Sequence, residues 1–199
     1  MIRIAVLASG NGTNFEALVK SAKTLRAARI CLLITDVAGA YARVRARRLG
    51  VEAIHIDPKK FSARVDFDHA LLRCLRDARI DVVVLAGYMR ILSPRFVRAF
   101  KHKILNIHPA LLPAFPGVDA IRQAYDYGVK VTGVTVHLVD ELVDHGPILM
   151  QAVVNIDKGM ALEALEAKIH KIEHRVYPAA LRLFINNKCV VRGRHVQVR

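Results

Sequence analysis

The segment Asn106-Ile107-His108-Pro109 places an amide and an imidazole two residues apart at the end of an apolar run. Residues two apart in a β-strand face the same side, so Asn106 and His108 are expected to project together while Ile107 enters the core. Pro109 ends the strand, which puts both polar groups at the carboxyl edge of a sheet, where α/β proteins bind ligands. An amide donor beside a histidine can stabilise an oxyanion and transfer a proton. A lone histidine at a strand end is more often a structural, hydrogen-bonded group.

An acidic loop, residues 140–147 (Asp-Glu-Leu-Val-Asp-His-Gly-Pro), offers carboxylates for such a site. A carboxylate against an imidazole favours the protonated ring and fixes its tautomer, so an aspartate of this loop beside His108 would make a general acid. A solvated loop without a catalytic role is an equally good alternative. No serine or cysteine has a convincing nucleophile signature, which favours direct attack by a nucleophile of the substrate.

A glycine-rich loop, residues 9–14 (Ser-Gly-Asn-Gly-Thr-Asn), ends the first apolar run. Glycines let the backbone approach a ligand, and the helix that follows offers free N–H groups to an anion. Phe15 stands where a dinucleotide fingerprint needs a small residue, so the loop suits one phosphate monoester better. The alternative is a plain turn capped by Thr13 or Asn14. Asp36 ends the second strand, where a ribose-binding acid would stand, and keeps a nucleotide cofactor open.

Other candidate segments carry weaker signals. Residues 87–92 (Gly-Tyr-Met-Arg-Ile-Leu) surround Arg90 with apolar side chains, which suits a flat heterocycle that carries an acid, although a plain connection explains them too. Glu166, His170 and Glu173 have ligand-like helical spacing, but a solvent-facing stripe explains them better, and no metal is expected. The 3 cysteines form no CxxC pair, so neither a disulfide framework nor a zinc site is expected.

Strands that alternate with helices are needed to position these groups, and the first half of the chain has the sequence pattern of such an alternation. Its apolar runs lack inside–outside alternation, which is typical of parallel strands covered on both faces. We therefore predict an α/β fold with a doubly wound, mostly parallel sheet, in a single domain over residues 1–199. The predicted strands are 2–8, 30–35, 53–56, 81–86 and 104–107, and the predicted helices are 13–23, 41–49 and 62–78.

The alternation of strands and helices stops after residue 107. Several prolines lie in the segment 109–117, and they predict a rigid loop. The strongest helical periodicity of the chain covers 161–177, and Pro178 is expected to kink or restart that helix. The other predicted elements are a short helix over 119–127, strands over 131–138 and 148–156, and a terminal hairpin over 188–199.

Together these segments resemble the folate-dependent phosphoribosylglycinamide formyltransferases. The resemblance is collinear as far as about Leu183. It implies a Rossmann-like formyltransferase fold and transfer of a formyl group from 10-formyltetrahydrofolate to the amine of glycinamide ribonucleotide in purine synthesis, with no metal and no covalent enzyme intermediate. The matching stretches are residues 8–14, 82–94, 106–113, 133–137, 144–147, 172–174 and 177–178.

The resemblance also implies roles for individual residues. Asn106 and His108 match the pair that polarises the formyl oxygen and passes protons, and Asp144 matches the residue that tunes His108. Ala110 replaces a serine of many members, and His170 replaces a glutamine of some, which removes a hydroxyl from one loop and changes a substrate contact. The other implied roles are phosphate binding by Gly12, Thr13 and Asn14, ribonucleotide binding by Glu173, and folate binding by Arg64, Met89, Arg90, Ile91, Leu92, Asn106 and Asp140.

Several alternatives stay open beside this resemblance. A formyltetrahydrofolate hydrolase is expected to carry a regulatory domain before its first strand, which here begins at Ile2, and a methionyl-tRNA formyltransferase a further RNA-binding domain after the last helix. A sugar-nucleotide formyltransferase is expected to be longer and to lack the glycine loop of residues 9–14. A nucleotide-cofactor oxidoreductase would use that loop and Asp36, yet would leave Asn106, His108 and Asp144 without a role.

The chain is strongly basic, with 31 Lys and Arg against 17 Asp and Glu and a net charge of +14. Such a charge favours anionic ligands, but no aromatic RNA-binding motif accompanies it, so we expect steering of small anions rather than nucleic-acid binding. No apolar run approaches the roughly 18 residues of a membrane span. We expect a cytoplasmic protein with small-molecule substrates that acts as a monomer or homodimer.

Overall fold

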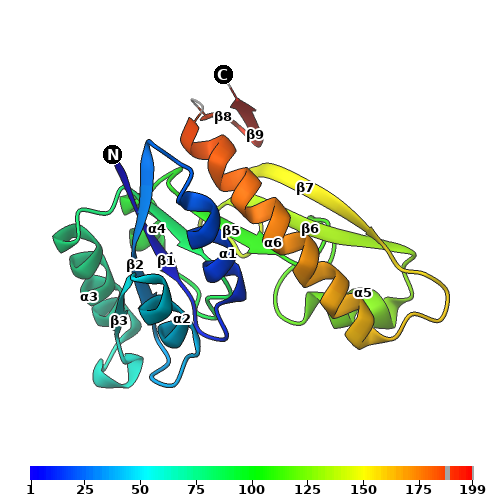
Figure 1. The fold of residues 1–199 in the computed structure, drawn as a ribbon, viewed down its shortest axis with the longest axis horizontal. Coiled ribbons are helices and arrows are strands. Elements are labelled where there is room, and N and C mark those ends of the chain that lie inside the picture. The colour runs from blue at the N-terminus through cyan, green and yellow to red at the C-terminus, as the bar shows by residue number, and fades with distance from the viewer. Residues whose placement is uncertain (187–188, 199) are drawn as a thin grey trace. The chain divides into compact units, whose positions relative to one another are not determined.

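The computed structural model describes residues 1–186 and 189–198. The chain divides into two compact units, Met1–Leu105 and Asn106–Arg199, and each combines strands with helices (Figure 1). In the part of the chain that the structure describes, no helix is both long enough and apolar enough to cross a membrane.

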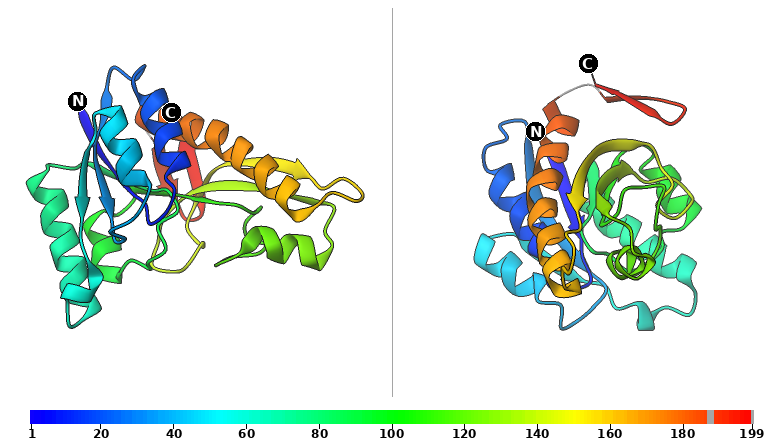
Figure 2. Two further views of the ribbon diagram at one scale, coloured as in Figure 1. Left: turned by 60° about the horizontal axis from the view of Figure 1, so that its bottom comes forward. Right: turned by 90° about the vertical axis from the view of Figure 1, so that its right-hand side faces the viewer.

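The first unit is a parallel sheet whose successive strands are joined by helices. Its elements are β1 (Ile2–Leu7), α1 (Thr13–Ala22), β2 (Ala28–Thr35), α2 (Ala42–Leu49), β3 (Glu52–His55), a 3-10 turn (Pro58–Lys60), α3 (Arg64–Asp77), β4 (Val82–Leu85) and α4 (Pro94–Ala99). The strand order is β3-β2-β1-β4, with parallel pairing. Because such crossovers are right-handed, α1 and α2 cover one face and α3 the other (Figure 2).

The strand order reverses between β1 and β4, and this is where doubly wound folds bind ligands. The loops that leave the carboxyl ends of these strands lie side by side, because the Ser9 N–H donates to the Gly87 carbonyl at 3.0 Å. Strand β4 is buried along its whole length, as expected for a strand covered on both faces. The glycine loop and residues 87–92 therefore meet at one edge of this sheet.

The second unit is a mixed sheet covered by a long helix. It begins within β5 (Ile104–His108), at Asn106, and continues with α5 (Ala120–Tyr127), β6 (Val131–Leu138), β7 (Ile148–Asn155), α6 (Leu162–Asn186), β8 (Cys189–Arg192) and β9 (His195–Val198). The strand order is β5-β6-β7-β9-β8. Strands β6 and β7 are antiparallel, as are β8 and β9, whereas β7 and β9 are parallel. Helix α6 packs on β6 and β7 through Leu165 and Ile169, which are fully buried.

The predicted α/β fold with mostly parallel strands is confirmed, and the predicted elements are present with small shifts at their ends. Helix α4 was not predicted, although Ser93 caps it by accepting from the Phe96 N–H and Pro94 opens it. Pro178 does not end α6, because the turn that contains it is buried with Tyr177 and Leu181, and this packing outweighs the missing N–H.

The predicted terminal hairpin is present as the antiparallel pair of β8 and β9, and the predicted end positions 188 and 199 lie outside the described residues. The single-domain assignment stays a prediction.

Candidate active site

The glycine loop of the first unit forms the N-terminus of α1. Gly12 is the N-cap residue, with φ 77° and no side-chain cap bond of its own. The N-cap position therefore belongs to Gly12, and the helix begins at Thr13. A Cβ on Gly12 would lie 2.6 Å from the Cβ of Ala42, so glycine is required by both conformation and space. A helix N-terminus presents main-chain N–H groups and the positive end of its dipole, which is what the predicted phosphate site requires.

Arg45, on α2, holds the residue that precedes Gly12. Its Nε donates to the Asn11 carbonyl at 2.9 Å, and its second guanidinium nitrogen donates to Asn11 Oδ1 at 2.7 Å. The same side chain pairs with Glu16 in the first turn of α1. The loop is thus braced from outside by an arginine that the sequence did not single out.

Asp36 follows β2, where a ribose-binding acid would stand. Its Oδ1 accepts the hydroxyl hydrogen of Ser9 at 2.6 Å, and the Ser9 oxygen accepts from the Met89 N–H at 3.0 Å. Asp36 is therefore engaged in joining the glycine loop to the loop after β4. This use weakens the nucleotide-cofactor alternative.

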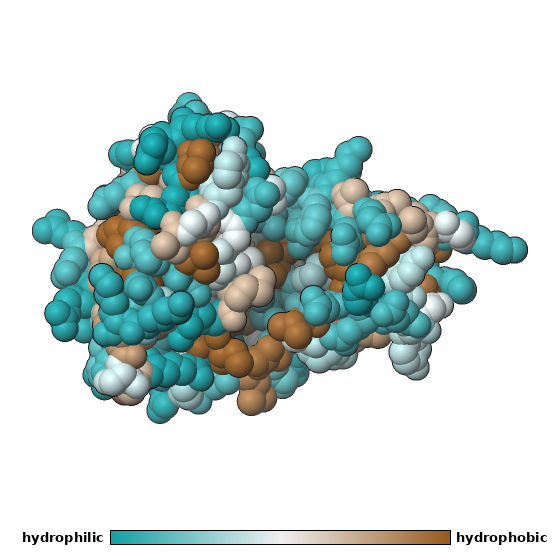
Figure 3. All heavy atoms as spheres, turned by 90° about the horizontal axis from the view of Figure 1, so that it is seen from below, coloured by the Kyte–Doolittle hydropathy of each residue, from teal (hydrophilic) through white to brown (hydrophobic). Residues whose placement is uncertain are grey.

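The predicted folate-binding residues of the first unit gather after β4. Met89 and Ile91 are 73% and 61% exposed, whereas Leu92 is buried. Figure 3 shows that hydrophobic side chains gather among hydrophilic ones on one face of the protein. Arg64 donates to the Ile91 carbonyl at 2.6 Å, and the Arg90 guanidinium lies 4.8 Å from the centre of the Phe67 ring. Two cations thus flank an exposed apolar segment, which suits a flat, acidic ligand.

The predicted catalytic residues of the second unit meet around Asp144. One carboxylate oxygen lies 3.3 Å from His108 Nδ1, and the other accepts from Asn106 Nδ2 at 3.3 Å. Asn106 and His108 project from the same side of β5, as the two-residue period predicts. The His108 side chain is 5% exposed and that of Asp144 10%. The three residues named from the sequence therefore form one nearly buried cluster.

His137, at the end of β6, is a fourth member of this cluster, and sequence reasoning missed it. Its Nδ1 faces the Leu138 carbonyl at 3.1 Å, and its Nε2 faces Asn106 Nδ2 at 3.1 Å. A carbonyl can only accept, so Nδ1 donates to Leu138, and Nε2 also lies 3.6 Å from an oxygen of Asp144. The two-residue period places Thr135 and His137 on one side of β6, which is a signal that could have found His137.

His108 has a different hydrogen-bonding pattern. Its Nε2 faces the Phe115 carbonyl at 2.7 Å and its Nδ1 faces Asp144, so both ring nitrogens meet acceptors. The doubly protonated ring satisfies both contacts. His108 and His137 therefore flank one carboxylate, that of Asp144.

Asp144 is ionised in this setting. Burial alone raises its pKa, but the His137 side chain, the Gly117 N–H at 2.8 Å and the charge of His108 lower the pKa below its ordinary value. Asp144 also has a positive φ of 48°, which is uncommon for a residue with a side chain. The surrounding hydrogen bonds hold it there.

The loop that follows β5 lacks the serine expected at position 110, and a different hydroxyl orders it. Thr135 Oγ1 donates to the Ala110 carbonyl at 2.7 Å and accepts from the Leu112 N–H at 3.0 Å. Gln151 donates to the same oxygen and to the Leu112 carbonyl, each at 3.0 Å. The proline-rich segment predicted to be rigid is thus fixed by groups on β6 and β7.

The two remaining predicted residues have partners of their own. Asp140 accepts from His145 Nδ1 at 2.7 Å on the loop that also carries Asp144. Glu173 is buried on α6 and bonds His170 Nδ1 at 3.0 Å. That bond, opposed by burial and supported by the charges of Glu173 and Glu166, raises the pKa of His170. Within residues 1–186 and 189–198, no group of three or more His, Cys, Asp or Glu could hold a metal ion.

A model of the formyl transferase family matches residues 2–181 of the chain. The chain belongs to the formyl transferase family. It is 43% identical over 191 residues to phosphoribosylglycinamide formyltransferase of Bacillus subtilis, across 94% of this chain and 98% of that protein.

Solved structures give the same result. Glycinamide ribonucleotide transformylase 1 of Symbiobacterium toebii is 48% identical with a TM-score of 0.96, covering 100% of this chain and 94% of that one. The Geobacillus kaustophilus enzyme of the same name is 50% identical with a TM-score of 0.90, covering 93% and 99%. The similarity to these formyltransferases therefore extends over nearly the whole of each chain.

Proposed function

We propose that this protein transfers the formyl group of 10-formyltetrahydrofolate to the amine of glycinamide ribonucleotide in purine synthesis. The observation that carries the proposal is the buried cluster in which Asp144 faces both His108 and Asn106. The likeness to phosphoribosylglycinamide formyltransferases over nearly the full chain supports the same substrates. Neither a metal nor a covalent enzyme intermediate is part of the proposal.

The reaction begins when the substrate amine attacks the formyl carbon. The carbonyl π pair moves to oxygen and forms an oxyanion, which the His108 imidazolium and the Asn106 amide stabilise. Loss of one such donor typically costs about 2.7–4 kcal/mol of transition-state stabilisation. Collapse of the intermediate breaks the bond to the folate nitrogen, which takes up a proton while the attacking nitrogen loses one. His108 passes this proton, and Asp144 holds the charged ring in place.

The hydrogen bonds of the cluster must change when substrates bind. His108 Nε2 donates to Phe115, and the Asn106 amide nitrogen donates to His137 and Asp144. When the oxyanion forms, it must therefore accept from a nitrogen that in this structure donates to a protein acceptor. The 3.3 Å bond from Asn106 to Asp144 is the longer of the two amide bonds and the easier one to exchange.

The binding roles follow the same proposal. The first turn of α1, at Gly12, Thr13 and Asn14, holds the phosphate of the ribonucleotide through main-chain N–H groups, and Glu173 contacts the ribonucleotide. The folate is bound by residues whose apolar surface and cations suit its ring and acidic tail. These residues are Arg64, Met89, Arg90, Ile91, Leu92, Asn106 and Asp140.

One assay tests the proposal. The purified protein is incubated with 10-formyltetrahydrofolate and glycinamide ribonucleotide together, and with the folate alone. Formylated ribonucleotide that appears only with both substrates is the expected result. Loss of the formyl group without the amine would identify a hydrolase, and absence of both reactions would refute the proposal.

A further inference from the structure

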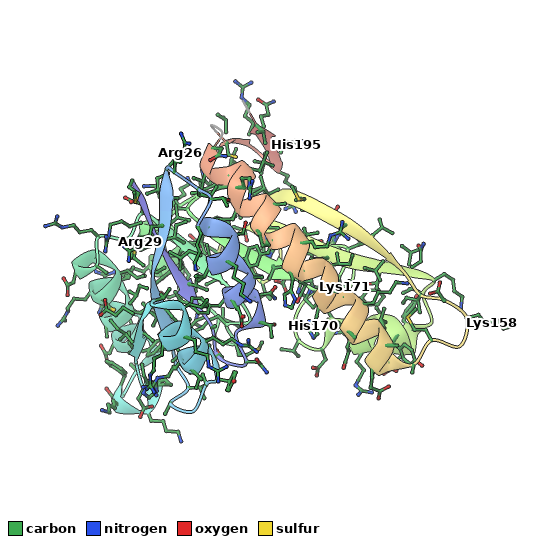
Figure 4. All side chains as sticks on the ribbon, in the orientation of Figure 1. Arg26, Arg29, Lys158, His170, Lys171 and His195 are labelled. Atoms are coloured by element: carbon green, nitrogen blue, oxygen red, sulfur yellow. The ribbon has the colours of Figure 1, made fainter. Side chains whose placement is uncertain are left out.

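The hairpin of β8 and β9 lies beyond residue 181, where the family match ends, and the proposed function gives it no role. Strand β9 extends the sheet by pairing with β7 at Ile148 and His195, and Figure 4 labels His195. Arg194, the residue before His195, contacts the loop of residues 139–146, which overlaps the acidic loop of residues 140–147. This contact joins the hairpin to the segment that carries Asp144.

Arg194 binds that loop at His145, the residue after Asp144. One guanidinium nitrogen donates to the His145 carbonyl at 2.7 Å, and another lies 3.0 Å from His145 Nε2. His145 Nδ1 in turn lies 2.7 Å from Asp140 Oδ2. Because guanidinium only donates and carboxylate only accepts, the neutral His145 tautomer with hydrogen on Nδ1 satisfies the chain of contacts. Arg194, His145 and Asp140 thus form a continuous chain of hydrogen bonds.

The loop between β6 and β7 is closed tightly at its base. The Leu138 N–H donates to the Pro147 carbonyl at 2.9 Å, and a Cβ on Gly146 would lie only 1.7 Å from the Leu138 carbonyl oxygen. Arg194 binds the His145 carbonyl directly before this fixed base.

Asp144 needs such support because its backbone is in the left-handed region, with φ 48°. A conformation of this kind costs of order 1–3 kcal/mol and persists only where the surroundings fix it. The side chain of Asp144 is held from within by Asn106, His108 and the Gly117 N–H. The backbone next to it is held from the hairpin by Arg194.

We propose that Arg194 is a positioning residue, which acts through His145 to hold the loop of residues 139–146 and with it Asp144 in the reactive arrangement. The C-terminal hairpin is then part of the support of the active site. The kinetic side of this proposal rests on the proposed formyl transfer, whereas the structural side does not.

This chain of hydrogen bonds is exposed, since the His145 and Asp140 side chains are 48% and 37% accessible. Exposed polar pairs contribute little to folding stability. Loss of Arg194 should therefore alter the loop and the reaction without unfolding the protein. A kinetic effect without loss of folding stability would distinguish a positioning role from a merely structural one.

The test compares Arg194→Ala with Arg192→Ala in the full chain. Arg192 is an exposed arginine of the same hairpin, and in the described part of the chain its side chain makes no hydrogen bond or ion pair. Arg194→Ala is expected to lower kcat by about tenfold, as small misplacements of catalytic groups do. The KM for glycinamide ribonucleotide should stay unchanged, and the acid limb of the kcat profile should move to higher pH as Asp144 loses its fixed environment. Arg192→Ala should match the wild type.

Two further variants keep the test decisive. Arg194→Lys can donate to the His145 carbonyl but not to the ring at the same time, so it should restore kcat only in part. His145→Ala removes the ring and keeps the carbonyl, and should also have an intermediate effect. Equal kinetics for Arg194→Ala and Arg192→Ala would overturn the proposal.

Hydrogen exchange measured by mass spectrometry gives a readout that does not depend on formyl transfer. Arg194→Ala should speed amide exchange in residues 139–146 and leave β6 protected. If the wild type transfers no formyl group but this exchange difference appears, the proposed function fails and the positioning contact stands. If exchange is unchanged in a folded Arg194→Ala variant, the positioning proposal fails whatever the activity.

Discussion

The glycine loop of the first unit and the Asp144 cluster of the second are built in opposite ways. The loop offers main-chain groups, and its geometry depends on the missing side chain of Gly12, which has φ 77° and lies against Ala42. The cluster offers side chains, and its geometry depends on which atoms of Asn106, His108 and Asp144 donate and accept. A phosphate needs many weak donors in a fixed shape, whereas proton transfer needs a few groups in defined protonation states.

The electrostatic settings differ as well. In the first unit Glu16 is stabilised as a carboxylate by Lys20 and then Arg45, which together lower its pKa at the surface. In the second unit Asp144 is nearly buried, so its charge survives only because donors surround it. The first region should therefore tolerate changes of charge better than changes of shape, and the second the reverse.

The largest expected effect comes from Asp144→Asn, which keeps the shape of the cluster and changes its charge. An amide cannot accept from every neighbour of Asp144, so His108 loses the partner that favours its charged, oriented form. We expect kcat to fall by about 10⁴-fold, as it does when a Ser-His-Asp triad loses its histidine-orienting aspartate. The KM values should change little.

Steady-state kinetics on both substrates measures this effect. Asp126→Asn is a matched control, because Asp126 is exposed on α5 and no hydrogen bond or ion pair of its side chain occurs among the described residues. A kcat for Asp144→Asn within tenfold of the wild type would contradict the role given to its charge.

Gly12→Ala tests the shape of the loop. The added methyl would lie 2.6 Å from Ala42 and would force a left-handed conformation on alanine. We expect the KM for glycinamide ribonucleotide to rise by about 10- to 100-fold, a loss of roughly 1.4–2.7 kcal/mol, with a smaller effect on kcat.

Gly10→Ala is the control for Gly12→Ala in the same loop, since no described atom lies within 4 Å of a Cβ at position 10. A ribonucleoside analogue without the phosphate should show no difference between Gly12→Ala and the wild type. If both glycine variants raise the KM equally, the loss comes from general disorder of the loop and not from the fit of Gly12.

A smaller effect, on stability, is expected from Thr135→Val. The Thr135 hydroxyl serves Ala110, Leu112 and Gln151 at once, and valine of the same shape leaves the Leu112 N–H without that acceptor. The free energy of unfolding should fall by about 1–3 kcal/mol, which is the usual cost of a buried unsatisfied group. Chemical denaturation measures it. An unchanged midpoint would show that the loop after β5 is ordered by its prolines alone.

The same contrast explains what could be predicted from the sequence. Gly12, Asn106 and His108 were found because their signals are local, namely a glycine between strand and helix and a two-residue period before a proline. His137, Arg45 and Arg194 act through partners 31, 34 and 49 residues away in the chain, and no local spacing reports such contacts.

The smallest effect expected is that of His170→Gln, and it concerns pH. The bond to Glu173 raises the pKa of His170 against the opposing effect of burial, so the charged pair is complete below the ordinary value of 6.5 and is lost as pH rises through the higher value. In the proposed function the ribonucleotide contacts Glu173, so an intact pair would compete with it. The His170 side chain is 55% exposed, so solvent screens the pair, and it is worth about 0.2–1 kcal/mol. The KM ratio of wild type to His170→Gln should therefore fall about 1.4- to 5-fold between pH 6 and pH 8.5, with kcat unaffected.

Measuring both enzymes at each pH cancels the titration of the substrate amine, which is common to the two. Lys171→Gln is the matched control, because Lys171 neighbours His170 on α6 (Figure 4) and its side chain makes no hydrogen bond or ion pair within the described residues. A KM ratio that is constant with pH would show that Glu173 does not exchange its histidine for substrate. The ribonucleotide site would then depend on the shape of the glycine loop and not on side-chain charge.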